Sequence, residues 1–187
     1  MIPVILPICN IEHVLHSTDM YAESFEPIAA STARVLILGT LPGQVSLQQR
    51  QYYALPRNVF WRIMGELFGA SPDLPYSIRA AKLIENGVAL WDVCGAAYRP
   101  GSLDTSIRHP VPNNFLAFFN AHPQVKLICF NGSKAAELYQ RDVLPLLPLS
   151  MQQLRQQTLP STSPANAAMS YAQKFSHWSI VRNECQT

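Results

Sequence analysis

One short run near residue 35 constrains the fold more than any other part of this 187-residue chain. It reads Val35-Leu-Ile-Leu-Gly-Thr-Leu-Pro-Gly43, so four aliphatic residues are followed directly by a turn that contains glycine and proline. Such a run predicts a buried strand that opens into a loop. Ligands of α/β sheets bind beyond the carboxyl ends of the strands. We therefore expect loop 39–43 to border a binding site.

The remaining pattern alternates strand-like and helix-like segments. Beside the strand at 34–39, further strands are expected at 88–93, 125–130 and, at an edge of the sheet, 156–159. Helices are expected at 58–69, 77–86, 114–121, 133–144 and from Ser163 onward. This alternation predicts an α/β fold, a three-layer α/β/α sandwich with a short, mainly parallel central sheet.

This pattern also predicts a long loop and the start of the last helix. Residues 95–112 are rich in glycine, proline, serine and arginine, and are expected to form a long loop. The last helix is expected to have Ser163 as its N-cap and Pro164 at its first position. Its buried stripe would then consist of Ala165, Ala168, Met169, Ala172 and Phe175.

Composition excludes several classes of protein. A hydrophobic content of 48% and this length fit one domain with one core. No run of 18 apolar residues is present, so no membrane span is expected. The first residues lack a basic segment and contain Pro3 and Pro7, which is not typical of a signal peptide.

The cysteines and the charged residues say less about the function. The four cysteines form no Cys-x-x-Cys pair, so no metal site is expected, and Cys94 and Cys129 are predicted to be buried thiols in a reduced, cytoplasmic protein. All 14 lysines and arginines follow residue 33. A basic body suits a phosphate backbone, although it also suits many other proteins.

Sequence motifs narrow the function. The chain contains no Walker A sequence, no Gly-x-Gly-x-x-Gly and no Gly-x-Ser-x-Gly. It does contain four other segments in a fixed order: Gly39-Thr-Leu-Pro-Gly43, Gln51-Tyr-Tyr-Ala-Leu-Pro-Arg-Asn-Val-Phe-Trp61, Phe130-Asn-Gly132 and Leu159-Pro-Ser-Thr-Ser-Pro-Ala-Asn-Ala167. Together they resemble the motifs of the uracil-DNA glycosylase superfamily. The hypoxanthine-DNA (deoxyinosine) glycosylase branch, near the mismatch-specific uracil/thymine glycosylases, is the most similar.

The resemblance implies a monofunctional DNA repair glycosylase. Such an enzyme flips out a deaminated base, here hypoxanthine or uracil, and hydrolyses its N-glycosidic bond to leave an abasic site. The resemblance also implies that the protein needs no cofactor. It further implies a monomer that acts on damaged double- or single-stranded DNA and associates with the nucleoid. Residues 25–187 would form the glycosylase domain and residues 1–24 an N-terminal extension, flexible in part.

Two other classes of function stay open. The chain could be a weak or inactive module of this fold that only binds damaged DNA or nucleotides, or a small-molecule α/β hydrolase whose loop holds phosphate. Binding without product would favour the first, and indifference to DNA would favour the second.

The resemblance also assigns catalysis. Several branches place Asp or Asn before the proline of the first loop, where this chain has Leu41. In the most similar branch, the asparagine of Pro-Arg-Asn is the replacement, which is Asn58 here. Asparagine is also a favoured N-cap, so Asn58 could simply start a helix. Because an amide accepts no proton at pH 7, Asn58 would orient a water molecule, and donors such as the N–H groups of loop 39–43 would hold the departing base.

Base binding is assigned to three places by the same resemblance. Asn131 would read the edge of the flipped base, although it could also only stabilise a turn. Tyr53 would stack beneath the base, and Tyr52 is the alternative. Either tyrosine could instead be an ordinary core residue. The first loop would complete the base pocket with Gly39, Thr40, Leu41, Pro42 and Gly43.

The last motif is expected to hold a DNA phosphate. Ser161, Thr162 and Ser163 offer hydroxyls and N–H groups before a predicted helix, which is an anion site in addition to a helix cap. Leu159 stands where other branches have a histidine that stabilises the leaving base, so strong uracil activity is in doubt.

Charged residues complete the set of candidates. The basic residues that flank the loops are interpreted as solvated surface charges or phosphate contacts: Arg57, Arg99, Arg108 and Lys134. Asp92 and Asp104 are candidate catalytic or supporting carboxylates. Asp92 lies in an apolar strand, so it needs partners that offset its desolvation.

Overall fold

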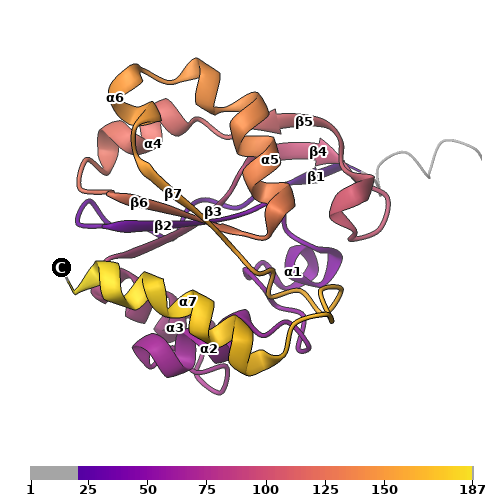
Figure 1. The fold of residues 1–187 in the computed structure, drawn as a ribbon. Coiled ribbons are helices and arrows are strands. Elements are labelled where there is room, and N and C mark those ends of the chain that lie inside the picture. The colour runs from indigo at the N-terminus through magenta and orange to yellow at the C-terminus, as the bar shows by residue number, and fades with distance from the viewer. Residues whose placement is uncertain (1–20, 187) are drawn as a thin grey trace, which may run out of the picture.

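The computed structural model describes residues 21–186, which form three layers with a parallel sheet in the middle (Figure 1). The sheet has the order β3-β2-β6-β7, and all three pairings are parallel. Its strands are β2 (Val35–Gly39), β3 (Val88–Asp92), β6 (Leu127–Asn131) and β7 (Arg155–Leu159). This architecture confirms the predicted α/β sandwich.

Helices cover both faces of the sheet. Helices α2, α3 and α7 lie on one face, and α4, α5 and α6 lie on the other (Figure 1). The helices are α1 (Gln44–Gln49), α2 (Phe60–Phe68), α3 (Tyr76–Glu85), α4 (Phe115–Ala121), α5 (Ser133–Asp142), α6 (Leu149–Gln152) and α7 (Tyr171–Cys185). Within residues 21–186, no helix has the length and apolar character needed to cross a membrane.

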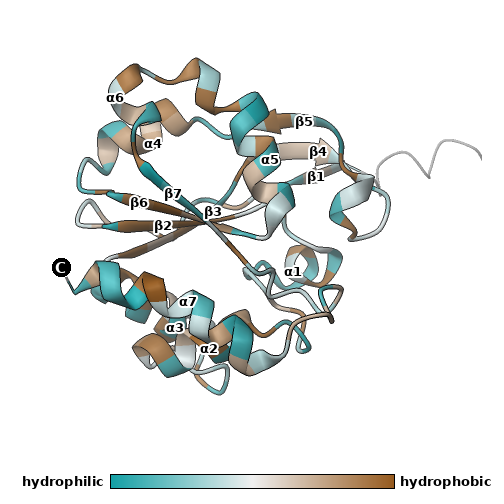
Figure 2. Cartoon of the chain, viewed as in Figure 1, coloured by the Kyte–Doolittle hydropathy of each residue, from teal (hydrophilic) through white to brown (hydrophobic). Residues whose placement is uncertain are grey.

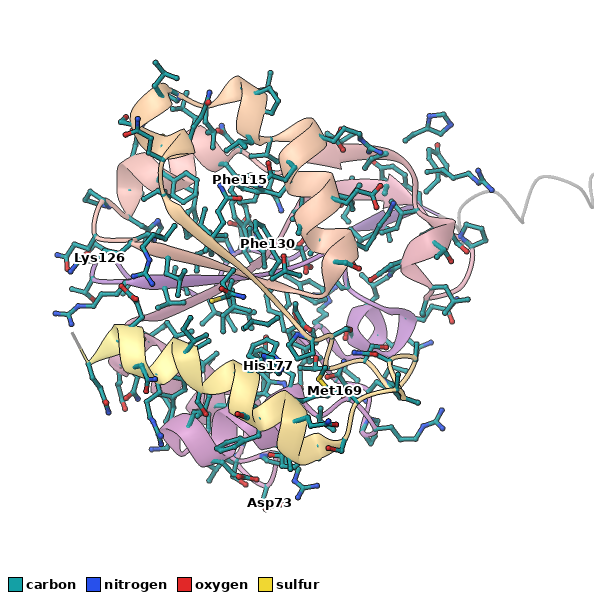
Figure 3. All side chains as sticks on the ribbon, viewed as in Figure 1. Asp73, Phe115, Lys126, Phe130, Met169 and His177 are labelled. Carbon is teal, nitrogen blue, oxygen red and sulfur yellow. The ribbon has the colours of Figure 1, made fainter. Side chains whose placement is uncertain are left out.

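The two-sided cover explains the sequence of the strands. Every residue of β2, β3 and β6 is buried, so these strands are almost continuously apolar. Strand β7 lies at the edge and is polar, as Figure 2 shows, and only its last residue, Leu159, is buried. Figure 3 shows Phe115 and Phe130 between the sheet and α5, where both rings contact Tyr139.

The prediction of a long loop at 95–112 is wrong. This segment contributes β4 (Cys94–Tyr98) and β5 (Arg108–Pro112), which form an antiparallel sheet with β1 (Tyr21–Glu23) in the order β1-β4-β5. Glycine, proline and alanine are depleted in strands, and they dominate these two strands, so the local sequence hid them. Strand β1 lies within the expected extension 1–24, of which residues 1–20 fall outside the described part.

The predicted start of the last helix is also wrong. Helix α7 begins at Tyr171, because Ser170 and Gln173 form a reciprocal capping box. Of the expected stripe, Ala165, Ala168 and Met169 precede the helix and Ala172 is exposed, whereas Phe175 packs against the core. The fully buried residues of α7 are instead Lys174, Trp178 and Val181.

We predict that the sheet centre carries much of the stability. Ile37 is fully buried in the central strand β2, so Ile37→Ala should lower the free energy of unfolding by about 2–5 kcal/mol in a urea titration. The matched control is Leu146→Ala, because Leu146 is 76% exposed. The control should change the free energy by less than about 0.5 kcal/mol. Equal effects of the two variants would contradict this assignment of the core.

Candidate active site

Three adjacent strands end in residues that face one edge of the sheet. Asp92 ends β3, Gly39 ends β2 and Asn131 ends β6, in the spatial order β3-β2-β6. The middle position has no room for a side chain, because a Cβ on Gly39 would lie 2.4 Å from Asp92 Oδ1 and 2.9 Å from the Tyr53 hydroxyl. Glycine at this position therefore allows the carboxyl and the phenol to approach the end of the central strand.

The Asn131 amide is fixed by Thr162. Asn131 Nδ2 donates to Thr162 Oγ1, and the Thr162 N–H donates to Asn131 Oδ1, both at 2.9 Å. The carbonyl of Thr162 accepts from the N–H of Val59 at 3.1 Å. The buried Thr162 thus joins the end of β6 to the segment that starts α2, and the Asn131 amide keeps one N–H and one lone pair.

Asn58 lies at the start of α2. The N-cap of α2 is Val59, so the prediction that Asn58 is the N-cap is wrong. Asn58 Oδ1 still accepts a hydrogen bond from the N–H of Phe60, the first residue of the helix, at 3.0 Å. The side chain is half-buried, and its Nδ2 has no hydrogen-bond partner within residues 21–186. That free N–H group, together with the second lone pair of Oδ1, is what remains for a water molecule.

The two tyrosines have different surroundings. Tyr52 is a core residue, because its hydroxyl donates to the carbonyl of Phe25 and its own carbonyl accepts from Trp61 Nε1. Tyr53 has a left-handed φ of 54°, and its ring stacks on Phe60 with centroids 4.1 Å apart. Its hydroxyl is buried near the Asn131 side chain, which acts to lower the pKa of the phenol, but no hydrogen bond of regular geometry forms with a described residue. Tyr53 is therefore the tyrosine that reaches the strand ends.

Arg99 holds the first loop. Its guanidinium donates to the carbonyl of Leu41 at 3.0 Å and to the carbonyl of Pro42. Arg99 is 3% exposed, so the interpretation of it as a solvated surface charge is wrong. No sequence pattern indicates this role, because the partners are backbone carbonyls and the arginine follows a strand that the sequence did not predict.

The same loop has polar contacts on its other groups. Thr40 Oγ1 donates to Asp104 Oδ1 at 2.7 Å, and Asp104 lies 3.8 Å from Arg99. The N–H groups of Leu41 and Gly43 have no hydrogen-bond acceptor within the described part of the chain. They are therefore free to donate to a ligand.

The motif around Ser161 is a compact turn, not a helix N-terminus. Ser161 Oγ accepts from the N–H of Ser163, and Ser163 Oγ accepts from the N–H of Ala165, both at 3.2 Å. Since α7 begins only at Tyr171, the expected helix dipole does not reach these serines. Lys174 Nζ, from inside α7, supports the turn by donating to the carbonyl of Asn166.

Burial changes the ionisation of the site. Desolvation raises the pKa of Asp92 to about 7, although a hydrogen bond from Ser24 and the charge of Arg99 act in the opposite direction. Burial likewise raises the pKa of Asp104 and of the Tyr53 phenol.

The predicted buried thiols are confirmed, and burial raises the pKa of Cys94 and Cys129 to about 12. Among the described residues, no group of three or more His, Cys, Asp or Glu side chains could hold a metal ion.

Comparison with known proteins then identifies the family. The model of the "Uracil DNA glycosylase superfamily" matches residues 26–184. This chain belongs to that superfamily. A "Hypoxanthine DNA glycosylase" from Methanosarcina acetivorans is 36% identical over 87% of this chain and 98% of its own length. Another of that description, from Methanosarcina barkeri, is 39% identical over 63% of this chain and 75% of its own length.

A solved structure agrees with this membership. The solution NMR structure of a candidate uracil DNA glycosylase from Methanosarcina acetivorans has a TM-score of 0.75 and 35% sequence identity. The match covers 90% of this chain and all of that one. The predicted family, its fold and its enzyme class, the DNA N-glycosylases, are confirmed for this uracil DNA glycosylase superfamily member.

We predict that the link between Thr162 and Asn131 stabilises the glycosylase fold. Thr162→Val keeps the side-chain shape but leaves the Asn131 Nδ2 without its buried acceptor, so it should cost about 1–3 kcal/mol in unfolding free energy. Thr162→Ser retains the hydroxyl and is the matched control. Urea unfolding of both variants measures the difference, and a Val variant as stable as the Ser variant would disprove the role of the hydroxyl.

Proposed function

We propose that this chain removes hypoxanthine from DNA by hydrolysing the N-glycosidic bond, and that it leaves an abasic site. Two relatives described as hypoxanthine DNA glycosylases support hypoxanthine as the substrate. The observation that carries the proposal is the hydrogen-bonded connection between the Asn131 amide and the segment that holds Asn58. The buried Thr162 bonds to Asn131 and also to Val59, the residue next to Asn58. Both side chains can then contact one everted nucleotide.

The base is held between the strand ends and the first loop. The remaining N–H and lone pair of Asn131 suit the edge of a base, which presents both an acceptor and a donor. Tyr53 contributes an aromatic face, and stacking on such a face is worth about 1–3 kcal/mol per base. That energy is comparable to the few kcal/mol that unstacking a nucleotide costs.

The hydrolysis depends on the departing base more than on a strong nucleophile. Asn58 orients the attacking water but accepts no proton, so the bond to the sugar breaks early and leaves negative charge on the base. The oxocarbenium-like sugar then takes the water, whose proton passes to the departed base or to solvent. The free N–H groups of Leu41 and Gly43 face that charge as fixed donors. The expectation of no cofactor remains part of this proposal.

The DNA backbone is contacted by the turn after β7. The hydroxyl hydrogens of Ser161 and Ser163 are free to donate to a phosphate, because both oxygens accept from backbone N–H groups. The proposal covers single- and double-stranded DNA, a monomeric protein, and a cytoplasmic location with association with the nucleoid on DNA.

The proposal is tested with oligonucleotides that contain one deoxyinosine or one deoxyuridine. After incubation with stoichiometric protein, alkali should cleave the strand at deoxyinosine, and more slowly at deoxyuridine, because Leu159 offers no polar group to the leaving base. Salt-dependent binding without cleavage of either substrate would favour the alternative of an inactive binding module.

The role of Asn58 can be separated from its helix-starting hydrogen bond. Asn58→Ser retains an oxygen for the N–H of Phe60 but lacks the amide, so it should keep its melting temperature and DNA binding and lose about 100-fold or more in single-turnover rate. Asn58→Ala should lose both the rate and some stability. A serine variant with undiminished turnover would remove Asn58 from the reaction.

A further inference from the structure

Asp92 and Asn131 lie in the same row of strand ends, on either side of Gly39. Asp92 ends β3, two strands away from Asn131, a distance of roughly 10 Å between strand axes. Gly39, between them, has no side chain, and Asp92 Oδ1 leans over it. The carboxyl therefore points from one side of the strand row toward the middle.

The hydrogen-bonding capacity of this region is only partly used. Ser24 Oγ donates to Asp92 Oδ2 at 3.1 Å, and it is the single side-chain donor to this carboxyl among the described residues. The neighbouring Tyr53 hydroxyl is buried and makes no hydrogen bond of regular geometry, although the nearby Asn131 side chain acts to lower the pKa of this phenol. Buried polar groups in native proteins are nearly always paired, so these atoms indicate a ligand with polar atoms of its own.

We propose that Asp92, as the neutral carboxylic acid, donates its Oδ1 hydrogen to the ring carbonyl of the everted base and so holds the negative charge of the departing base. This inference deepens the proposed function and rests on it. Hypoxanthine and uracil both carry such a carbonyl beside a ring N–H. The donor fills the role for which Leu159 is unsuited. A neutral acid kept in a desolvated site is an effective donor to an oxyanion.

The protonation state follows from the surroundings of the carboxyl. The titratable and charged groups that interact with it are Tyr52 and Tyr53 from the segment before α2, Tyr76 from α3, Cys94 from β4, Arg99 after β4 and Asp104. The phenols and the thiol stay neutral near pH 7, because their pKa values are raised. Burial outweighs Arg99 and Ser24 and brings the pKa of Asp92 to about 7. Below that pH the acid donates, and above it the carboxylate repels the base anion.

The test is the pH dependence of single-turnover excision of hypoxanthine between pH 5.5 and 9. The wild-type rate should fall as the pH rises through about 7. Asp92→Asn replaces the O–H donor by an N–H donor of the same shape, so at pH 6 it should stay within about tenfold of wild type and lose the alkaline decline. Asp92→Ala should lose about 100-fold, the effect of removing one such donor. Asp104→Asn is the matched control and should retain the alkaline decline, moved to lower pH, because the charge of Asp104 raises the pKa of Asp92.

A second variant tests the same idea without changing Asp92. Ser24→Ala removes a hydrogen bond that lowers the pKa of the carboxyl, so the alkaline decline should move to higher pH. Thermal unfolding of each variant checks that it folds. If an Asp92 variant does not fold, the wild-type and Ser24→Ala profiles decide alone.

Several results would overturn the inference. A wild-type rate that rises through pH 7 would make Asp92 a base, and an asparagine variant as inactive as the alanine variant would remove the donor role. Failure of the wild type on every lesion would instead contradict the proposed function. In that case, affinity for an oligonucleotide with 2′-fluoro-2′-deoxyinosine, measured by anisotropy across the same pH range, decides: weaker binding above pH 7 supports the donor, and constant binding overturns it.

Discussion

The pairing between Asn131 and Thr162 organises this edge of the molecule. It joins three segments that are distant in the sequence, the end of β6, the turn after β7 and the start of α2, through side-chain and backbone hydrogen bonds. Because Thr162 is almost completely buried, none of these hydrogen bonds competes with water. The positions of both asparagines relative to the strand ends therefore depend on one threonine.

The site is assembled from both sheets. The parallel sheet supplies the row Asp92, Gly39 and Asn131, whereas the antiparallel sheet β1-β4-β5 leads to Arg99. Arg99 fixes the carbonyls of the first loop, and its charge favours the ionised form of the neighbouring carboxyls. The glycosylase motifs thus need a second layer of residues that belong to none of them.

Much of the fold followed from local sequence signals. The strand that ends at Gly39 and the apolar spacing of α2 identified their elements, because burial on two faces or on one helix face leaves a plain pattern. The antiparallel sheet could not be predicted in this way, since β5 contains two prolines and β4 contains glycine and alanine, residues that do not favour strands. Two signals for the start of a helix lie close together, the Ser-Pro pair at 163 and the capping box at Ser170. Which of them starts the last helix depends on what the helix packs against.

Some features of the candidate site could likewise be predicted from the sequence, and others could not. Side chains within the motifs, such as Asn58, Asn131 and Tyr53, were predictable as residues, and the structure brings them to one edge. The role of Arg99 in holding the first loop could not be predicted, because its partners are carbonyl oxygens that every sequence has. The two tyrosines could be told apart only by their contacts.

Ser24 gives the segment before the motifs a chemical role. It follows β1 directly and donates its hydroxyl to Asp92, while its N–H donates to the carbonyl of Gly95. A shortened protein that starts at residue 25 would keep all four glycosylase motifs and still lose this contact. Engineering the boundary of this domain would thereby alter the acidity of its interior, and not only its solubility or yield.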